Sequence, residues 1–331
     1  MYQFLSLFAS HSPLYDQLND QAAAYAAEKG FAYKWVPQNP YNKEEVISLL
    51  KQCDVGLIDV EPYDASIFSK IYDRCKLLVR FGVGYDKVNL PDATRYGICV
   101  ARTAGANAPG VAEMAFTMIL ALRRQLEINR RVVESGVWVR HVAVEMVSKT
   151  VGIVGFGAIG QILAKLCSGF DCQVLAYDAY PNREKMQELG VTYCPLEELV
   201  QRSDAISIHV PYCPETHHMF DKRMLGLMKP DAVLVCTARG NLVDEDALYD
   251  ALIHNRIGGA GLDVFAAEPL PVTSRLIGLD NVILTPHVAS QTVGSLWATY
   301  KKAIDIAADF FAGKPIGKAD LLNPEYANRL Q

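Results

Sequence analysis

The sequence lacks a long hydrophobic run, an excess of positive charge and closely paired cysteines. Its longest apolar stretch, around Val111–Leu122, is too short to span a bilayer and contains Glu113. The N-terminal residues have neither the basic start nor the sustained apolar core of a signal peptide, so we expect no secretory leader. The formal net charge of −5 provides no general attraction for nucleic acid or acidic membranes. These absences favour a cytoplasmic protein that binds neither nucleic acid nor membrane.

The eight cysteines are scattered along the chain and do not have the spacing of a zinc knuckle. Cys167 and Cys172 are too far apart for such a pair, and no second pair follows them. Cys213 could in principle bind a metal together with His217 and His218, but a polar loop of this kind is usually just solvated. We therefore expect no metal, and cysteines that are reduced.

The sequence does contain a repeated alternation of short apolar runs and helical patterns. Its 331 residues, half of them hydrophobic and 21% charged, suffice for two globular domains. Repeated strand–helix units build parallel sheets covered by helices on both faces, so we expect an α/β protein. The strands expected in the first series are Gln3–Phe8, Tyr33–Val36, Val55–Asp59, Leu77–Phe81 and Ile98–Ala101, with helices at Leu14–Glu28 and Lys43–Gln52. The six strands expected in the second series, the number in a dinucleotide-binding sheet, are Thr150–Val154, Gln173–Tyr177, Ala205–His209, Ala232–Cys236, Gly258–Asp263 and Val282–Leu284.

Two long helical patterns flank the second series of strands. The strongly apolar pattern Asn107–Arg130 fits either a buried helix between domains or an oligomer contact, and an irregular stretch, Val132–Lys149, follows it. The second pattern, Ser290–Ala312, ends at a Gly-Lys-Pro stop signal. The tail Ile316–Gln331 is too short to form a domain, so we expect it to pack on the N-terminal domain.

The segment VGIVGFGAIG has the spacing of a dinucleotide-binding turn between a strand and a helix expected over Gly160–Gly169. Gly155 permits the tight turn, Gly157 lets the backbone approach a pyrophosphate, and Gly160 lets the helix pack closely on the strand. Amides at the helix start, including those of Ala158 and Ile159, can then hold the phosphates. A glycine turn without a nucleotide is the alternative, and the position of the motif between strand and helix argues against it.

The strand after this turn ends in Asp178, which lies 178 − 160 = 18 residues beyond the last glycine. An acid about 20 residues beyond that glycine binds the adenosine ribose hydroxyls and repels a 2′-phosphate. The sequence therefore predicts NAD as the cofactor, while the nearby Arg183 leaves NADP as an alternative.

Three side chains that follow later strands could supply hydroxy acid chemistry. Arg239 follows the strand AVLVC, Glu268 lies beyond the strand that ends near Asp263, and His287 follows VILTPH. Carboxyl ends of strands are where ligands bind in open α/β sheets. Taken singly, an arginine such as Arg239 usually forms a surface salt bridge, and a histidine such as His287 is usually structural. Asp263 could simply cap a turn. As an ordered set behind a dinucleotide turn, they favour an active site.

These segments together resemble the D-isomer-specific 2-hydroxyacid dehydrogenase family, which includes D-lactate and D-3-phosphoglycerate dehydrogenases and glyoxylate/hydroxypyruvate reductases. The resemblance covers nearly the whole chain. It is carried by LLVRFGVGYDKVNL, the glycine turn, DAISIHVPYCPET, the arginine segment CTARGNLVDEDAL, GLDVFAAEP and LTPHVAS.

The resemblance implies roles for individual residues. Arg239 would bind the substrate carboxylate and polarise the 2-oxo group. His287 would exchange the hydroxyl proton, and Glu268 would fix its tautomer and favour its protonated form. Asp263 would orient the nicotinamide ring, and the amides of Val83 and Gly84 would hold the substrate carboxylate. Residues expected to line the cofactor are His209, Val210, Pro211, Thr216, Thr237 and Ala238.

The resemblance also implies the architecture. A Rossmann-type NAD-binding domain, residues 103–291, would be inserted into a flavodoxin-like substrate-binding domain, residues 1–102 and 292–331, with the active site in the cleft between them. Family members are commonly dimers, and residues 107–149 correspond to the contact. Ala104 stands where many relatives have proline, which concerns only a turn, and Glu268 argues against a formate dehydrogenase, whose pattern has glutamine there.

The function expected from this resemblance is an NAD-dependent D-2-hydroxyacid dehydrogenase that works as a reductase of a small 2-oxo acid. The alternative is an NAD(H)-sensing, corepressor-like binding protein of the same superfamily, which could keep the same residues. The substrate side chain would be chosen by loops around Asp59–Tyr63, Phe81–Tyr85 and Trp297–Tyr300. The sequence alone does not identify the acid.

Overall fold

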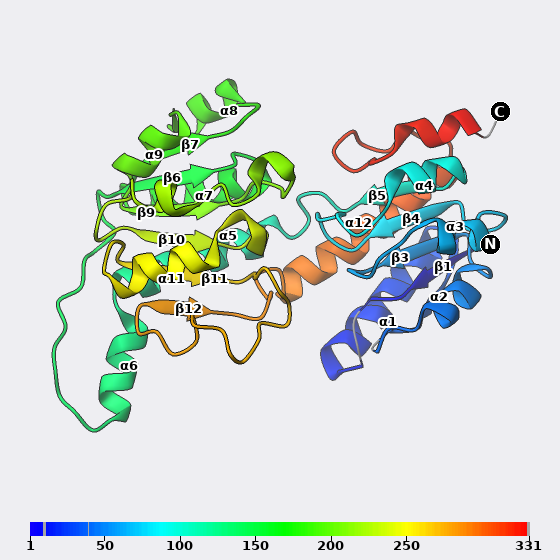
Figure 1. Ribbon diagram of the computed structural model, residues 1–331. Helices are drawn as coiled ribbons and strands as arrows, with labels where there is room; N and C mark the ends of the chain where they lie inside the picture. Colours follow the sequence, from blue (N-terminus) through cyan, green and yellow to red (C-terminus); the bar gives the residue numbers. More distant parts are fainter. Residues whose placement is uncertain (9–10, 39, 330–331) are drawn as a thin grey trace. The chain divides into compact units, whose positions relative to one another are not determined.

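The computed structural model describes residues 1–8, 11–38 and 40–329. It divides into two compact units, each an α/β layer structure (Figure 1). Unit 1 consists of residues 1–107 and 292–331, and unit 2 of residues 108–291. In the described part of the chain, no helix combines the length and the apolar character needed to cross a bilayer.

Unit 1 contains a five-stranded parallel sheet with the order β2-β1-β3-β4-β5, which is the flavodoxin-like order. Adjacent residues of one strand face opposite sides of the sheet. Phe4 therefore packs in the core shared with α1 and α12, whereas Leu5 packs in the core under α2 and α3. The strands are β1 Tyr2–Ser6, β2 Phe31–Trp35, β3 Val55–Ile58, β4 Leu77–Arg80 and β5 Cys99–Arg102. The helices are α1 Pro13–Glu28, α2 Lys43–Leu50, α3 Ala65–Ile71, α4 Leu90–Arg95, α12 Val293–Phe311 and the 3₁₀ turn η3 Pro324–Arg329.

The chain after α12 returns to the sheet of unit 1, as the sequence predicts. Leu322 donates its backbone N–H to the carbonyl of Val100, and the Asn323 side chain accepts the Val100 N–H at 2.7 Å. The last two residues of the predicted tail lie outside the described residues.

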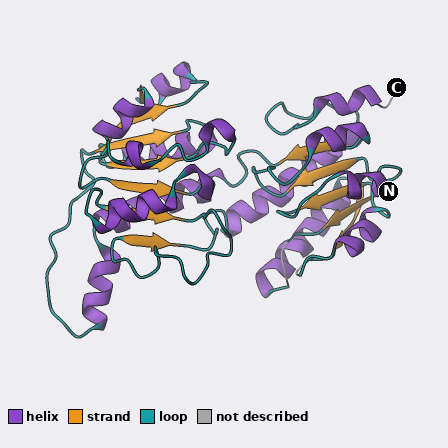
Figure 2. Ribbon diagram, viewed as in Figure 1, coloured by secondary structure: helices purple, strands orange, loops and turns teal. Residues whose placement is uncertain are grey.

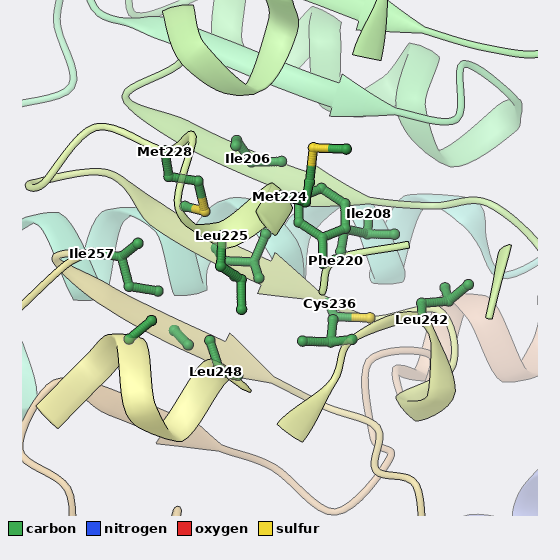
Figure 3. Close-up of a cluster of buried hydrophobic side chains, with 14 of the residues drawn as sticks. Ile206, Ile208, Phe220, Met224, Leu225, Met228, Cys236, Leu242, Leu248 and Ile257 are labelled. Carbon is green, nitrogen blue, oxygen red and sulfur yellow. The ribbon is translucent and has the colours of Figure 1, made fainter. Parts of the chain in front are cut away.

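Unit 2 contains a seven-stranded parallel sheet with the order β12-β11-β10-β9-β6-β7-β8. Helices flank both faces of the sheet (Figure 2), with α5 and α7 in one hydrophobic core and α9, α10 and α11 in the other. Figure 3 shows the second core, where Phe220, Met224 and Leu225 pack against strand residues such as Ile206 and Ile208. The strands are β6 Thr150–Val154, β7 Gln173–Tyr177, β8 Thr192–Tyr193, β9 Ala205–Ile208, β10 Val233–Cys236, β11 Gly259–Leu262 and β12 Val282–Leu284. The helices are α5 Ala108–Arg123, α6 Leu126–Glu134, α7 Ala158–Ser168, α8 Arg183–Glu188, α9 Leu196–Arg202, α10 Lys222–Leu225 and α11 Glu245–Ile253, with 3₁₀ turns η1 Pro214–Thr216 and η2 Gly240–Leu242.

The structure corrects three expectations. The helix expected over Asn107–Arg130 is two helices, because Gln125 between α5 and α6 adopts the left-handed conformation, with φ of 51°. The two-residue strand β8 is additional, and it is too short to leave a sequence pattern. The first unit ends at Asn107 rather than at 102, since Thr103 binds Gly82 and the Ala104 N–H donates to Asp320, both in unit 1.

Candidate active site

The glycine turn of unit 2 joins β6 to α7 at the carboxyl edge of the sheet. Gly155 has φ of 99°, and a Cβ there would lie 2.7 Å from the His209 carbonyl carbon. A Cβ at Gly160 would overlap the Gly155 carbonyl oxygen, whereas one at Gly157 would meet nothing within 4 Å. The first and third glycines are thus required for packing, and the middle one leaves open space where α7 begins, next to Ala158 and Ile159.

Asp178, just beyond β7, holds the glycine turn in place. Its Oδ2 accepts the N–H of Phe156 at 2.7 Å, and its Oδ1 accepts that of Tyr180 at 2.8 Å. The carboxylate therefore lies beside the start of α7, which is the position expected of a ribose ligand. The Arg183 guanidinium stacks over the Tyr193 ring at 3.8 Å.

Two buried polar atoms at this edge have no hydrogen-bond partner among the described residues, namely His209 Nδ1 and Thr237 Oγ1. They follow the neighbouring strands β9 and β10. Burial lowers the pKa of His209 to about 3, so its imidazole is neutral at pH 7, with Nε2 2.9 Å from the Ser207 hydroxyl. Buried polar groups are normally satisfied, so this edge fits a polar ligand such as a dinucleotide.

His287 and Glu268 come together in unit 2, in the loops that follow β12 and β11. His287 Nδ1 lies 2.8 Å from Glu268 Oε2, and Glu268 Oε1 accepts the N–H of Phe265 at 3.0 Å. The pair is roughly two-fifths exposed. A carboxylate fixed in this way holds the proton on Nδ1, which leaves Nε2 as the nitrogen for proton exchange with a ligand.

Asp263, at the end of β11, is fully buried, and its carboxylate anchors the turn that carries His287. Oδ1 accepts the Thr285 hydroxyl at 2.6 Å and the Val288 N–H at 2.8 Å, and Oδ2 accepts the Ala289 N–H at 2.9 Å. The His287 N–H donates to the Asp263 carbonyl at 2.8 Å, and His287 has φ of 54°. Its described contacts therefore give Asp263 the turn-capping role that the sequence left open as an alternative, although a motif does not show which groups a carboxylate accepts.

Arg239 lies directly beyond β10, where its Nη1 donates to the Ala238 carbonyl at 2.7 Å. The next residue, Gly240, packs against the Phe265 backbone so closely that a Cβ would overlap the Phe265 carbonyl carbon. This close approach brings the segment that carries Arg239 against the segment that leads to Glu268. Arg239, Glu268 and His287 thus follow three adjacent strands of one sheet.

The other predicted residues occupy several places. Val210 and Pro211 continue from β9 beside the glycine turn, because the His209 N–H donates to the Val154 carbonyl at 2.7 Å. The Thr216 hydroxyl is engaged within its own loop, where it donates to the Pro211 carbonyl at 2.9 Å and accepts the Cys213 N–H at 2.8 Å.

Val83 and Gly84 lie in unit 1, in the turn after β4. Gly82 at the start of this turn donates its N–H to the Thr103 hydroxyl at 2.8 Å. His217 and His218 stack on each other with ring centroids 3.9 Å apart, and no group of three metal-binding side chains occurs within residues 1–8, 11–38 and 40–329.

Comparison with known proteins identifies the family. The sequence model described as "D-isomer specific 2-hydroxyacid dehydrogenase, NAD binding domain" matches residues 116–289. The chain belongs to this family. It is an NAD-dependent oxidoreductase, and both the glycine turn and the unsatisfied groups beside it belong to its NAD-binding unit.

Relatives of this dehydrogenase include a glyoxylate reductase from Korarchaeum cryptofilum, 39% identical over 264 residues, 77% of this chain and 79% of the relative. A hydroxypyruvate reductase from Thermotoga maritima is 34% identical over 76% of this chain and 82% of the relative. The structure of D-lactate dehydrogenase with NAD⁺ from Lactobacillus jensenii is similar, with a TM-score of 0.81, 27% identity and coverage of 95% and 98% of the two chains.

Proposed function

We propose that this dehydrogenase reduces a small 2-oxo acid to the D-2-hydroxy acid, with His287 as the proton donor and acceptor. The observation that carries the proposal is the 2.8 Å contact between His287 Nδ1 and Glu268 Oε2, in a family whose members use NAD. The bound cofactor supplies or accepts the hydride. The relatives named glyoxylate reductase and hydroxypyruvate reductase support small 2-oxo acids as the substrate class.

Each side chain has a separate task in this proposal. His287 gives a proton from Nε2 to the substrate oxygen in reduction and takes it back in oxidation. Glu268 keeps the imidazole oriented and stabilises its positive charge. Arg239 binds the substrate carboxylate and polarises the 2-oxo group, because a guanidinium offers paired donors.

The binding residues complete the proposal. The amides of Val83 and Gly84 bind the substrate carboxylate, and Asp178 accepts the adenosine ribose hydroxyls, while the stacking of Arg183 on Tyr193 favours NAD over NADP. Asp263 contacts the nicotinamide as well as the His287 turn. The residues proposed to line the cofactor are Gly155, Gly157, Ala158, Ile159, Gly160, His209, Val210, Pro211, Thr216, Thr237 and Ala238.

The variant His287→Asn tests the catalytic assignment. Asparagine removes the proton-exchanging nitrogen, so we expect kcat for glyoxylate or hydroxypyruvate to fall by about 10²-fold or more. NADH binding, measured by fluorescence titration, should change little. His254→Asn is the matched control, because His254 is an exposed histidine at the end of α11.

Turnover that survives in His287→Asn would place the proton donor elsewhere. If the wild-type protein binds NADH tightly but turns over no 2-oxo acid in a panel of side chains, the corepressor-like function is supported instead.

We also propose a homodimer formed through residues 107–149, in the cytoplasm. Helix α6 contains no buried residue, and the chain after it exposes large apolar side chains, including Trp138 and Val142. Figure 1 shows α6 and this chain extending away from the sheet of unit 2. The eight cysteines are free thiols, in keeping with a reducing compartment.

A further inference from the structure

Unit 2 contains a cavity of about 110 Å³ at the amino ends of its strands, whereas His287 and Glu268 follow the carboxyl ends. Its wall includes Val233, Gly258 and Asn281, which lie at the amino ends of β10, β11 and β12. The catalytic candidates follow the carboxyl ends of the same strands. The cavity is therefore separate from the proposed site of hydride transfer.

Arg123, the last residue of α5, contributes a buried guanidinium to this cavity and is only 5% exposed. Its Nη1 donates to the Asp231 carbonyl at 2.6 Å and lies 3.3 Å from the Asp231 carboxylate. Nε and Nη2 are buried, and no described residue accepts a hydrogen bond from either. These two atoms form the side edge of the guanidinium, which is the edge that binds a carboxylate through two parallel hydrogen bonds.

The charged groups around the cavity do not satisfy the Nε and Nη2 atoms of Arg123. Three carboxylates belong to the wall, but each already has a cationic partner. Asp231 pairs with Arg123, whereas Glu127 and Asp280 pair with Arg131 at 3.0 and 2.6 Å. Leaving the buried donors of a charged group unpaired costs free energy, so an acceptor beside Nε and Nη2 is favoured.

The remaining wall limits the size and character of the acceptor. Leu122, Ile128, Val144 and Ile283 provide an apolar surface, and Gln125 has a buried Oε1 without a partner among the described residues. A cavity of about 150 Å³ binds benzene, which has six heavy atoms, so this one has room for about four or five heavy atoms. That size suits a carboxylate with a short apolar stem.

We infer that this cavity is a carboxylate-binding site in which the Nε and Nη2 atoms of Arg123 hold the two oxygens. The carboxylate belongs either to a small free acid or to a side chain of a second copy of this chain. The site does not depend on the catalytic assignment, because the cavity and the Nε and Nη2 atoms of Arg123 are defined without His287. The second source rests on the proposed homodimer, because much of the cavity wall, including Arg123 and Val144, lies within residues 107–149.

Propionate, which has five heavy atoms, is the probe for the first source. Calorimetric titration should use protein that carries Arg239→Gln, so that the proposed substrate site contributes no binding. Adding Arg123→Lys keeps the charge but removes the paired donors, so we expect propionate binding to weaken by about tenfold. Arg124→Lys, at the adjacent exposed position, should leave it unchanged, and uncharged propionamide should bind poorly.

Self-association of the wild-type protein tests the second source. If a side chain of a second copy fills the cavity, propionate does not bind, and Arg123→Lys weakens self-association about tenfold in sedimentation experiments while Arg124→Lys does not. Ala121→Leu is the second variant, because it fills the cavity from α5 without changing Arg123. It should weaken whichever of propionate binding or self-association depends on the cavity, even if Arg123→Lys does not fold. The inference is overturned if neither propionate binding nor self-association responds to Arg123→Lys or Ala121→Leu.

Discussion

At the scale of single residues, His209 shows how burial determines the charge of a side chain. Its pKa is lowered to about 3 by burial, whereas a histidine in the unfolded chain titrates near 6.5. Between these two pH values the unfolded chain binds a proton that the folded chain does not. This titration therefore does not reduce stability above about pH 6.5, and as the pH falls from there toward 3 it lowers the free energy of unfolding by ~1.4 kcal/mol per pH unit.

The variant His209→Gln removes this titration and should flatten the pH dependence of unfolding. Urea unfolding without NAD at pH 7 and pH 5 should show a smaller loss of stability in the variant than in the wild type. The exposed His254, changed to Gln, is the control and should leave the pH dependence close to that of the wild type. Equal losses in wild type and His209→Gln would mean that His209 is accessible to protons in the folded chain.

At the scale of elements, the turn from Thr285 to Ala289 positions the catalytic candidate. Asp263→Asn replaces one acceptor oxygen by an amide, so the turn loses at least one hydrogen bond that holds His287 at its positive φ. We expect kcat to fall by about tenfold and the free energy of unfolding by about 1–3 kcal/mol.

Two readouts separate this positioning role from the proposed contact with nicotinamide. A positioning role leaves the dissociation constant of NADH nearly unchanged, whereas loss of a cofactor contact raises it. Thr285→Val removes one hydrogen bond to Asp263 Oδ1 and keeps the carboxylate, so we expect kcat to fall by less than in Asp263→Asn. An Asp263→Asn protein with normal kcat and normal stability would contradict the anchoring role.

The elements also show what the sequence could predict. All eleven strands expected from apolar, β-branched runs exist, with ends within two residues, because burial on both faces requires such runs. The break at Gln125 was missed because a non-glycine residue at positive φ leaves no local signal. The order of Arg239, Glu268 and His287 along the chain indicated a shared edge, but their contacts depend on approaches such as Gly240 against Phe265, which only the folded chain shows.

At the scale of the whole chain, several exposed apolar side chains of unit 2 lie in one stretch of the sequence, residues 126–147. Leu126, Val133, Val137, Trp138, Val139, Val142 and Val147 are all at least half exposed. Scattered exposed apolar residues need no explanation, but a group of this size in one segment is expected of an interaction surface. The sequence placed an oligomer contact among the alternatives for this region, and the exposure of these side chains supports the proposed homodimer.

Val142→Glu places a charge in this surface and should weaken the dimer. Val142 is 91% exposed in the single chain, so the substitution should leave its fold intact. Burying a valine in an interface contributes about 1.5–3 kcal/mol, so its loss should raise the dimer dissociation constant by about tenfold or more. Val272→Glu is the matched control, since Val272 is also 91% exposed but lies outside residues 107–149.

Sedimentation velocity over a dilution series measures the change in the dimer dissociation constant. A wild type that stays monomeric at the highest concentration, or a Val142→Glu protein that associates like Val272→Glu, would rule out this surface as the dimer contact.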